Sequence, residues 1–290
     1  MGPQIADWRR VISYLETLDD VDSDRIGIWG TSYAGGHAIV LGATDRRLSA
    51  VVAQVPVIEG FATGQWRVPD ARAALEREFD ADERAQLADE PPATRALVSD
   101  DPAAPAFYRD PHAVSTYLSP LPDGVTFENR ATPRSMRWTR MYRQGQWIDQ
   151  VSPTPLMMMI VARGDTTSGT DLQLRGYGDA LEPKRLVLLD GDHFDPYVKQ
   201  LAVAVQAAGT GSPPTSSPDH ARLRFARKDT RQSDLSPSRR RVDPTDGRYR
   251  QRRTVVRSAP FAVTGVLGFF VPCRDRHRTY WQIAHPWLPR

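Results

Sequence analysis

The feature that most constrains this chain is a glycine-rich turn at residues 30–36, with the sequence Gly-Thr-Ser-Tyr-Ala-Gly-Gly. A short apolar stretch at 25–29 precedes the turn, and a run of mostly small residues at 37–43 follows it. The first pattern predicts a buried strand and the second a helix. Small residues are needed in such a turn because the strand and helix backbones pass close together. The segment therefore predicts a strand–turn–helix unit of the kind that builds a parallel α/β sheet.

The alternation of helix and strand extends on both sides of a long interruption. Hydrophobic spacing predicts helices at 3–18, 171–181 and 196–208, and strands at 49–55, 156–161 and 184–189. Residues 1–58 and 151–208 are therefore interpreted as two parts of one α/β core, a partial α/β-hydrolase-type parallel sheet.

Residues 59–150 have a different character and are interpreted as a helical cap inserted over the sheet. A charged helical stretch at 70–90 is followed by many prolines, and a second helix is expected at 132–142. The aromatic side chains of this region fit the core of a lid better than a binding site; they are Trp66, Phe107, Tyr108, Tyr117, Trp138, Tyr142 and Trp147.

The last part of the chain, 209–290, is predicted to be a basic, disordered tail. Residues 201–290 hold 17 Lys and Arg against 6 Asp, a charge of +11, whereas the first 200 residues, with 21 basic and 29 acidic side chains, carry −8. A tail rich in Gly, Ser, Pro, Thr and Arg buries too little apolar area to offset chain entropy. The apolar segment 260–273 could be a strand, a segment that docks on a partner, or exposed apolar surface.

Composition excludes several classes of protein. The sequence contains no run of about 18 apolar residues, so no membrane span is expected. The first residues lack the pattern of a secretory signal, which favours a cytoplasmic location. A single cysteine, Cys273, excludes an intramolecular disulfide framework and a multi-cysteine zinc site. Neither a metal-ligand cluster nor a dinucleotide glycine motif is present, so no cofactor is expected.

Ser32 is the candidate nucleophile. The segment fits G-x-S-x-A-G-G, a close relative of the G-x-S-x-G turn that exposes a serine hydroxyl at the carboxyl edge of a sheet. The alternative is a strand-to-helix turn without chemistry.

His193 and Asp165 are the candidate base and acid. A hydroxyl is a poor nucleophile until a base takes its proton, and that base needs an orienting acid. His193 follows the strand that ends at Leu189, and Asp165 follows the strand that ends at Val161. The ends of parallel strands share one edge of a sheet, which is where these residues would meet. His193 could instead be a hydrogen-bonded loop residue, and Asp165 a turn residue.

Other titratable residues are weaker candidates for the site. Asp171 is the next candidate acid. His37, one turn into the helix after Ser32, is interpreted as a packing or helix-surface residue with a minor chance of a direct role, and His112 as a cap residue with a minor chance of touching substrate.

Three segments together resemble α/β-hydrolases of the dienelactone-hydrolase-like group, and more narrowly the branch of polyketide transferases and thiohydrolases. They are the nucleophile segment 24–37, the acid segment 152–165 and the histidine segment 182–194. The resemblance covers roughly residues 3–205. It implies ester, thioester or related acyl chemistry on a small molecule by Ser32, Asp165 and His193, with the backbone N–H of Tyr33 in the oxyanion hole.

The chain departs from this family at both ends. Only 31 residues precede Ser32, so the first strands and the loop that supplies the other oxyanion donor are expected to be missing. The strand at 25–29 would then have an open edge, which favours self-association. The change of composition near residue 208 suggests a shifted reading frame.

The leading hypothesis is therefore a serine hydrolase with a Ser-His-Asp triad, and three alternatives stay open. An acyl transferase would use the same triad. An incomplete hydrolase would keep the motif without turnover. The arginines of the tail could contact nucleic acid, but aromatic residues are sparse between them and no known fold motif accompanies them, which does not favour this reading.

Overall fold

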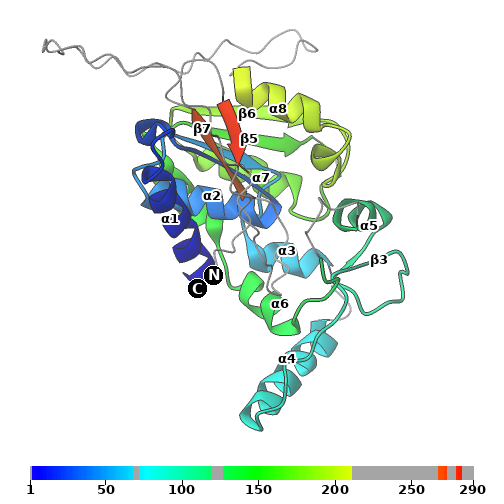
Figure 1. Cartoon of the computed structure of the whole chain (residues 1–290). Coiled ribbons are helices and arrows are strands. Elements are labelled where there is room, and N and C mark those ends of the chain that lie inside the picture. Colours follow the sequence, from blue (N-terminus) through cyan, green and yellow to red (C-terminus); the bar gives the residue numbers. More distant parts are fainter. Residues whose placement is uncertain are drawn as a thin grey trace, which may run out of the picture.

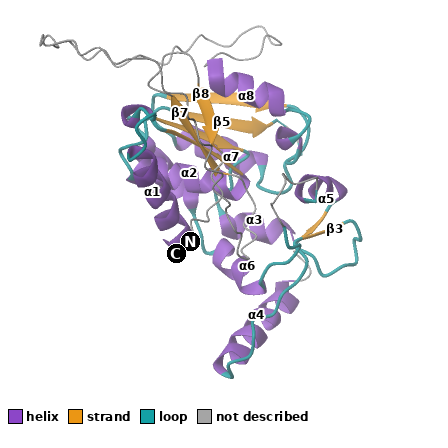
Figure 2. Ribbon diagram, in the orientation of Figure 1, coloured by secondary structure: helices purple, strands orange, loops and turns teal. Residues whose placement is uncertain are grey.

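A computed structural model describes residues 2–67, 72–118, 127–162, 164–210, 267–272 and 279–282 (Figure 1). Helices pack on both faces of a central sheet, and a group of helices extends away from it (Figure 2).

The six strands of the sheet have the order β6-β5-β2-β1-β7-β8. Four of them are mutually parallel: β1 (Gly27–Thr31), β2 (Ala50–Gln54), β5 (Leu156–Val161) and β6 (Lys184–Leu189). The other two strands extend the sheet beyond β1. β7 (Leu267–Pro272) pairs antiparallel with β1, and β8 (Thr279–Gln282) pairs antiparallel with β7. The parallel arrangement predicted for the core is confirmed, with strand ends within about two residues of the expected positions.

The central strands are buried on both faces, which explains their unbroken apolar sequence. All six residues of β5, Leu-Met-Met-Met-Ile-Val, are buried. Leu156, Met158 and Ile160 face one hydrophobic core, and Met157 and Met159 face the other. Alternate residues of a strand point to opposite faces, so a strand covered on both sides needs no polar positions.

Three helices and a 3₁₀ segment cover the first face: α1 (Gly2–Glu16), α2 (Ser32–Thr44), α7 (Thr170–Asp179) and η2 (Gln144–Val151). In α1 the apolar side chains recur at helical spacing, and Ile5, Trp8, Ile12 and Leu15 are buried against the sheet. In α2 every residue from Ser32 to Ala43 is buried, so this helix is enclosed by the rest of the core. A short 3₁₀ turn, η1 (Ser23–Arg25), leads into β1.

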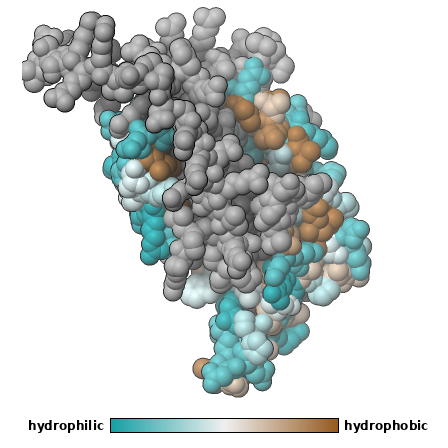
Figure 3. All heavy atoms as spheres, viewed as in Figure 1, coloured by the Kyte–Doolittle hydropathy of each residue, from teal (hydrophilic) through white to brown (hydrophobic). Residues whose placement is uncertain are grey.

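The second face is covered by α8 (Leu201–Thr210), whose Ala204 and Ala207 pack on the sheet. The helix predicted at 196–208 is divided in the structure, because η3 (Asp195–Tyr197) and a turn precede α8. Apolar residues also gather on the outer surface near α8 (Figure 3), where Val198, Leu201 and Val205 are exposed.

The region 59–150 is helical and lies beside the carboxyl ends of the parallel strands (Figure 1). Its elements are α3 (Gly60–Arg67), α4 (Arg72–Leu87), β3 (Val98–Ser99), β4 (Tyr108–Arg109), α5 (Pro111–Tyr117) and α6 (Pro133–Arg140). Ion pairs join α6 to α4; they are Arg134–Asp82, Arg137–Glu83 and Arg140–Glu76.

The expected lid aromatics divide between two cores. Phe107, Tyr108 and Tyr117 form a separate cluster around Phe194, whereas Tyr142 and Trp147 pack against the main core. Trp138 is exposed. The side chain of Trp66 lies outside the described residues.

The structure departs from the disordered tail expected at 209–290 in two places, where β7 and β8 are strands. β7 pairs antiparallel with β1: Phe269 lies opposite Ile28, and Gly268 lies opposite Trp29. The physical reason is that 260–273 is apolar and the β1 edge offers unpaired N–H and C=O groups. The open edge expected beside β1 is therefore covered. The rest of 211–290 lies outside the described residues, and disorder there stays a prediction.

Within the described residues, no helix is long and apolar enough to cross a membrane.

We predict that ending the chain after Thr210 destabilises the protein. Without β7, the backbone groups of Gly27–Gly30 lose their partners along one side, so the urea midpoint should fall and light scattering should report self-association. Full-length protein carrying Phe269→Pro should shift in the same direction, because proline cannot donate to the ladder. Unchanged midpoints in both variants would contradict this pairing.

Candidate active site

Ser32 stands at the turn between β1 and α2 in a strained backbone conformation. Its φ is +52°, in the left-handed region that non-glycine residues rarely adopt. Its side chain is almost fully buried, at 1% exposure. Such strain persists only where the surrounding structure imposes it, and it is found mostly at functional sites.

Close packing around Gly36 holds this turn in place. A Cβ atom on Gly36 would lie 2.6 Å from the Gln144 side chain and 2.7 Å from the carbonyl of Val57. The backbone N–H of Val57 donates to the carbonyl of Ser32 at 3.0 Å. The glycine therefore allows α2 to approach the segment after β2 and η2, and a larger residue would push the start of α2 away.

His193 lies in the loop after β6, within hydrogen-bonding distance of both other candidates. Its Nε2 is 2.9 Å from the Oγ of Ser32, and its Nδ1 is 3.1 Å from each carboxylate oxygen of Asp165. The loop is fixed by Asp195, whose carboxylate accepts the backbone N–H of Asp192 at 2.8 Å. Gly191, with φ +100°, leaves room for that carboxylate.

Asp165 follows β5, and three groups besides His193 donate hydrogen bonds to its carboxylate. One oxygen accepts the backbone N–H groups of Thr167 at 3.0 Å and Ser168 at 2.7 Å, and the other accepts the amide of Gln173 at 2.7 Å. Burial raises the pKa of Asp165, but the attraction and hydrogen bond of His193, with the hydrogen bonds from Ser168 and Gln173, outweigh burial and bring that pKa down to about 2. The carboxylate is therefore ionised at neutral pH and can stabilise a positive charge on His193.

Tyr197, at the end of η3, brings a hydroxyl group to the same place. The Thr31 hydroxyl donates to the Tyr197 hydroxyl at 3.0 Å, and the rings of Tyr197 and His193 have centroids 6.2 Å apart. Burial raises the pKa of Tyr197 well above its usual range, so the phenol keeps its proton.

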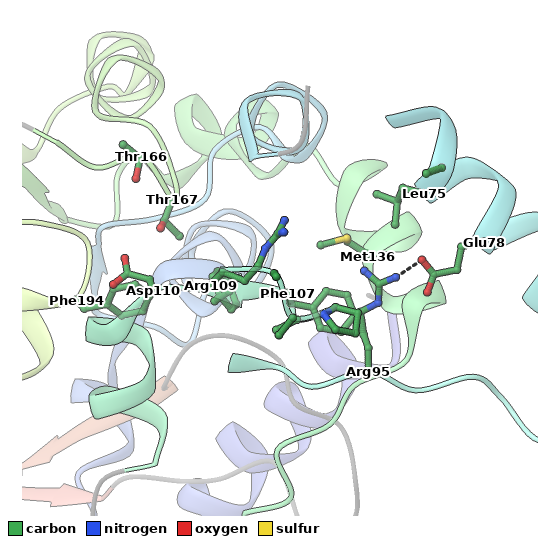
Figure 4. Close-up of a pocket in the computed structure, with 16 residues that line it drawn as sticks. Leu75, Glu78, Arg95, Phe107, Arg109, Asp110, Met136, Thr166, Thr167 and Phe194 are labelled. Atoms are coloured by element: carbon green, nitrogen blue, oxygen red, sulfur yellow. Dashed lines mark hydrogen bonds and ion pairs between the residues drawn. The ribbon is translucent and has the colours of Figure 1, made fainter. Parts of the chain in front are cut away.

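A cavity of about 540 Å³ lies mostly within the region 59–150 and reaches the neighbours of Asp165 and His193. Thr166, Thr167 and Phe194, the neighbours of Asp165 and His193, line one end, and the paired Arg95 and Glu78 line the other (Figure 4). A narrower space of about 40 Å³ reaches Tyr33. Both spaces are lined by Leu75, Tyr108 and Met136. Ser32 and His193 line neither space, so the larger cavity adjoins the site through Thr166, Thr167 and Phe194, and the smaller one through Tyr33.

The histidine loop is also the docking point of α5. Phe194 is buried against the rings of Tyr108 and Tyr117, with centroids 6.3 Å and 6.4 Å away. Nδ1 of His112, on α5, is 2.5 Å from a carboxylate oxygen of Asp192, within hydrogen-bonding distance. His112 therefore contacts the loop that carries His193.

Comparison with known proteins shows which proteins this chain is similar to. The model of the acetyl xylan esterase (AXE1) family matches residues 5–77. The quorum-quenching protein AidA of Acinetobacter baumannii is 30% identical over 199 residues, which cover 67% of this chain and 63% of AidA. Polyketide transferase grgF of a Penicillium species is 26% identical over 60% of this chain and 57% of its own length.

Solved structures agree in fold. The crystal structure of the α/β-hydrolase GrgF from Penicillium sp. sh18 superposes with a TM-score of 0.58 at 22% identity, over 71% of this chain and 69% of that one. The chain has the α/β-hydrolase fold. The resemblance drawn from the three sequence segments is confirmed at this level. The chain spans less than two thirds of the length of AidA and grgF.

The α/β-hydrolase fold brings together the three residues predicted as nucleophile, base and acid. Ser32, Asp165 and His193 follow β1, β5 and β6, and parallel strands end at one edge of the sheet. The hydrogen bonds of His193 in the described residues go to Ser32 and Asp165, whereas Asp171 lies in the first turn of α7. Tyr33 is in the first turn of α2, and the oxyanion role of its backbone N–H stays a prediction.

Sequence reasoning missed Gln173 and Tyr197. Gln173 is fully buried one turn into α7, a position where the helical pattern gives no sign of a polar role. The sequence pattern around Tyr197 predicts the start of a closing helix. Its position four residues after His193 is the available signal, because the loop that carries His193 also brings its near neighbours close to the Ser32 turn.

A second histidine, His37, lies below the nucleophile turn. Its Nδ1 is 3.1 Å from the Tyr142 hydroxyl, and its ring packs 4.9 Å from that of Tyr33. Burial lowers the pKa of His37 from 6.5 to about 3. The packing role expected for His37 agrees with this environment, because the ring stays neutral within an aromatic cluster.

We predict that His37 contributes to acid sensitivity of the fold. Between pH 6.5 and 3 the unfolded chain binds a proton that the folded chain does not, so stability falls as pH is lowered. From pH 7 to pH 5 the loss from this residue should be about 2 kcal/mol. In His37→Asn, urea unfolding should show a correspondingly smaller loss. Equal losses in both proteins would contradict the assignment.

Proposed function

We propose that this protein is a serine hydrolase that cleaves a small ester or thioester. The observation that carries the proposal is the continuous set of hydrogen bonds from Asp165 through His193 to Ser32, at a strained turn beside a cavity. A nucleophile bonded to a base, which is bonded to an orienting acid, is the arrangement that acyl transfer requires.

In the first step the Oγ of Ser32 attacks the acyl carbonyl carbon. The Ser32 proton passes to Nε2 of His193 as the new C–O bond forms, and the electron pair of the carbonyl double bond moves to the carbonyl oxygen. The backbone N–H of Tyr33 would stabilise that oxyanion. When the double bond reforms, the alcohol or thiol leaves with the proton from His193, and an acyl-enzyme remains.

In the second step water replaces the leaving group. His193 takes a proton from water, the hydroxide adds to the acyl carbon, and the bond to Ser32 breaks with return of the proton to Oγ. Asp165 accepts a hydrogen bond from Nδ1–H throughout, so Nε2 is the nitrogen available to receive the serine proton.

The names of the relatives support acyl chemistry without fixing a substrate. They include a thiohydrolase of Eupenicillium brefeldianum, 25% identical over 66% of this chain, besides the acetyl xylan esterase family. The cavity, with threonine and phenylalanine at the triad end and an ion pair at the other, suits a small molecule that is partly polar.

Acyl transfer is the second candidate, favoured by the similarity to a polyketide transferase and by a cavity of about 540 Å³ that has room for an acceptor beside an acyl group. Both reactions form the same acyl-enzyme. An added alcohol or thiol acceptor would divert the acyl group from water if transfer is the natural reaction.

We predict that a fluorophosphonate probe labels the protein covalently at Ser32 and that Ser32→Ala is unlabelled. The reason is that only a serine with a bound base attacks phosphorus at a useful rate. Intact mass measures the adduct, and the matching unfolding curves of both proteins serve as control. A label that persists in Ser32→Ala would place the reactive group elsewhere.

We predict that Asp165→Asn lowers kcat about 1,000- to 10,000-fold on a p-nitrophenyl ester. The N–H groups of Thr167 and Ser168 would hold the asparagine oxygen, so the new amide nitrogen would face Nδ1 of His193. Nδ1 would then accept and Nε2 would carry the proton, which prevents it from taking the serine proton. A variant that folds and retains most of its kcat would remove Asp165 from the mechanism.

A further inference from the structure

Gln173 is a polar side chain enclosed in the core behind the candidate acid. It stands one turn into α7 and is 0% exposed. Its Nε2 donates a hydrogen bond to Oδ2 of Asp165 at 2.7 Å. It lines neither of the two cavities near the site. The contact of Gln173 with the reacting groups therefore runs through Asp165, from an element that the proposed chemistry does not otherwise use.

The two oxygens of the Asp165 carboxylate are held from different sides. Oδ1 accepts the backbone N–H groups of Thr167 and Ser168, which belong to the same loop as Asp165. Oδ2 accepts the amide of Gln173, which comes from α7. Nδ1 of His193 lies 3.1 Å from each oxygen. The loop donors and the helix donor together fix the plane of the carboxylate, and without Gln173 the Oδ2 side would lose its anchor on the helix.

The other end of the Gln173 amide gains nothing from its burial. An ionised carboxylate only accepts hydrogen bonds, so Nε2 is the amide atom that faces Asp165. The buried Oε1 has no hydrogen-bond partner within the described part of the chain, which lowers stability. An apolar side chain of similar shape would avoid that loss. Packing alone therefore does not explain a glutamine at this position, whereas its contact with Asp165 does.

Burial opposes the charge that Asp165 has to carry in the proposed mechanism. A desolvated carboxylate tends to hold its proton, and a hydrogen bond to the charged form counteracts this tendency. The bond from Gln173 is one of the contacts that lower the pKa of Asp165 against burial. His193 becomes positive when it takes the Ser32 proton, and at that moment it needs an ionised carboxylate in the correct orientation.

We propose that Gln173 is a positioning residue, whose amide N–H orients the Asp165 carboxylate toward Nδ1 of His193 and keeps that carboxylate ionised. This inference rests on the proposed serine mechanism. No bond forms or breaks at Gln173 itself. When its donor is lost, the carboxylate can turn and is protonated more readily, so fewer molecules hold the imidazole in the orientation that accepts the Ser32 proton.

The matched pair Gln173→Met and Ser168→Ala tests this role. Both side chains are 0% exposed and each has an atom without a partner in the described residues, but only the Gln173 side chain donates to Asp165. We expect Gln173→Met to lower kcat on p-nitrophenyl acetate about 10-fold, with KM little changed. Ser168→Ala keeps its backbone donor, so its kcat should stay within about 2-fold of the unmodified protein.

Gln173→Glu separates the donor from the space that the side chain fills. Two carboxyl groups in one buried site share a proton. The donors on Oδ1 and His193 favour the ionised form of Asp165, so the proton belongs to the introduced carboxyl, whose O–H can then donate to Oδ2. At pH 6 the kcat of Gln173→Glu should therefore exceed that of Gln173→Met and approach that of the unmodified protein.

The fluorophosphonate label, read by intact mass after complete reaction, counts assembled sites. Each kcat is divided by that fraction, so a partly unfolded variant is still informative. A kcat of Gln173→Met within 2-fold of the unmodified protein would overturn the role of Gln173. Equal losses in Gln173→Met and Ser168→Ala, or in Gln173→Met and Gln173→Glu at pH 6, would overturn it as well. If the unmodified protein neither turns over ester nor takes the label, the serine mechanism itself fails, and Gln173 loses its role with it.

Discussion

Parallel pairing of β1, β2, β5 and β6 is the constraint on which the rest of the structure depends. Parallel strands cannot be joined by tight turns, so each connection must cross a face of the sheet, and helices then bury both faces. The same geometry sends every strand end to one edge. Residues that are 161 positions apart in the chain, Ser32 and His193, are therefore brought to a separation of 2.9 Å by backbone pairing rather than by any local signal.

The loop that carries His193 contacts both the Ser32 turn and the region 59–150. His193 hydrogen-bonds Ser32, whereas its neighbour Phe194 is buried in the aromatic cluster formed with Tyr108 and Tyr117. Asp192 adds a polar bond to α5 through His112. Movement of α5 would therefore displace the loop that positions the imidazole.

The core and the juxtaposition of Ser32, Asp165 and His193 could be predicted from sequence because each rests on a short-range pattern. The β5 run of six apolar residues, the small residues after Ser32 and the position of His193 beyond a strand are all visible locally. Gln173 and Tyr197 could not be assigned in the same way, because their roles come from tertiary contacts with Asp165 and Thr31. The partner of the β1 edge was also not predicted, since β7 lies more than 200 residues further along the chain.

That distance has a consequence for synthesis of the protein. The ribosome releases the chain from its N-terminus, so β1, β2, β5 and β6 can pair before residues 267–272 have been made. During that interval one side of β1 offers unpaired backbone groups to any neighbouring chain. Translation speed over the last third of the message, and chaperones that bind extended apolar segments, would then decide how much of the newly made protein reaches the folded state.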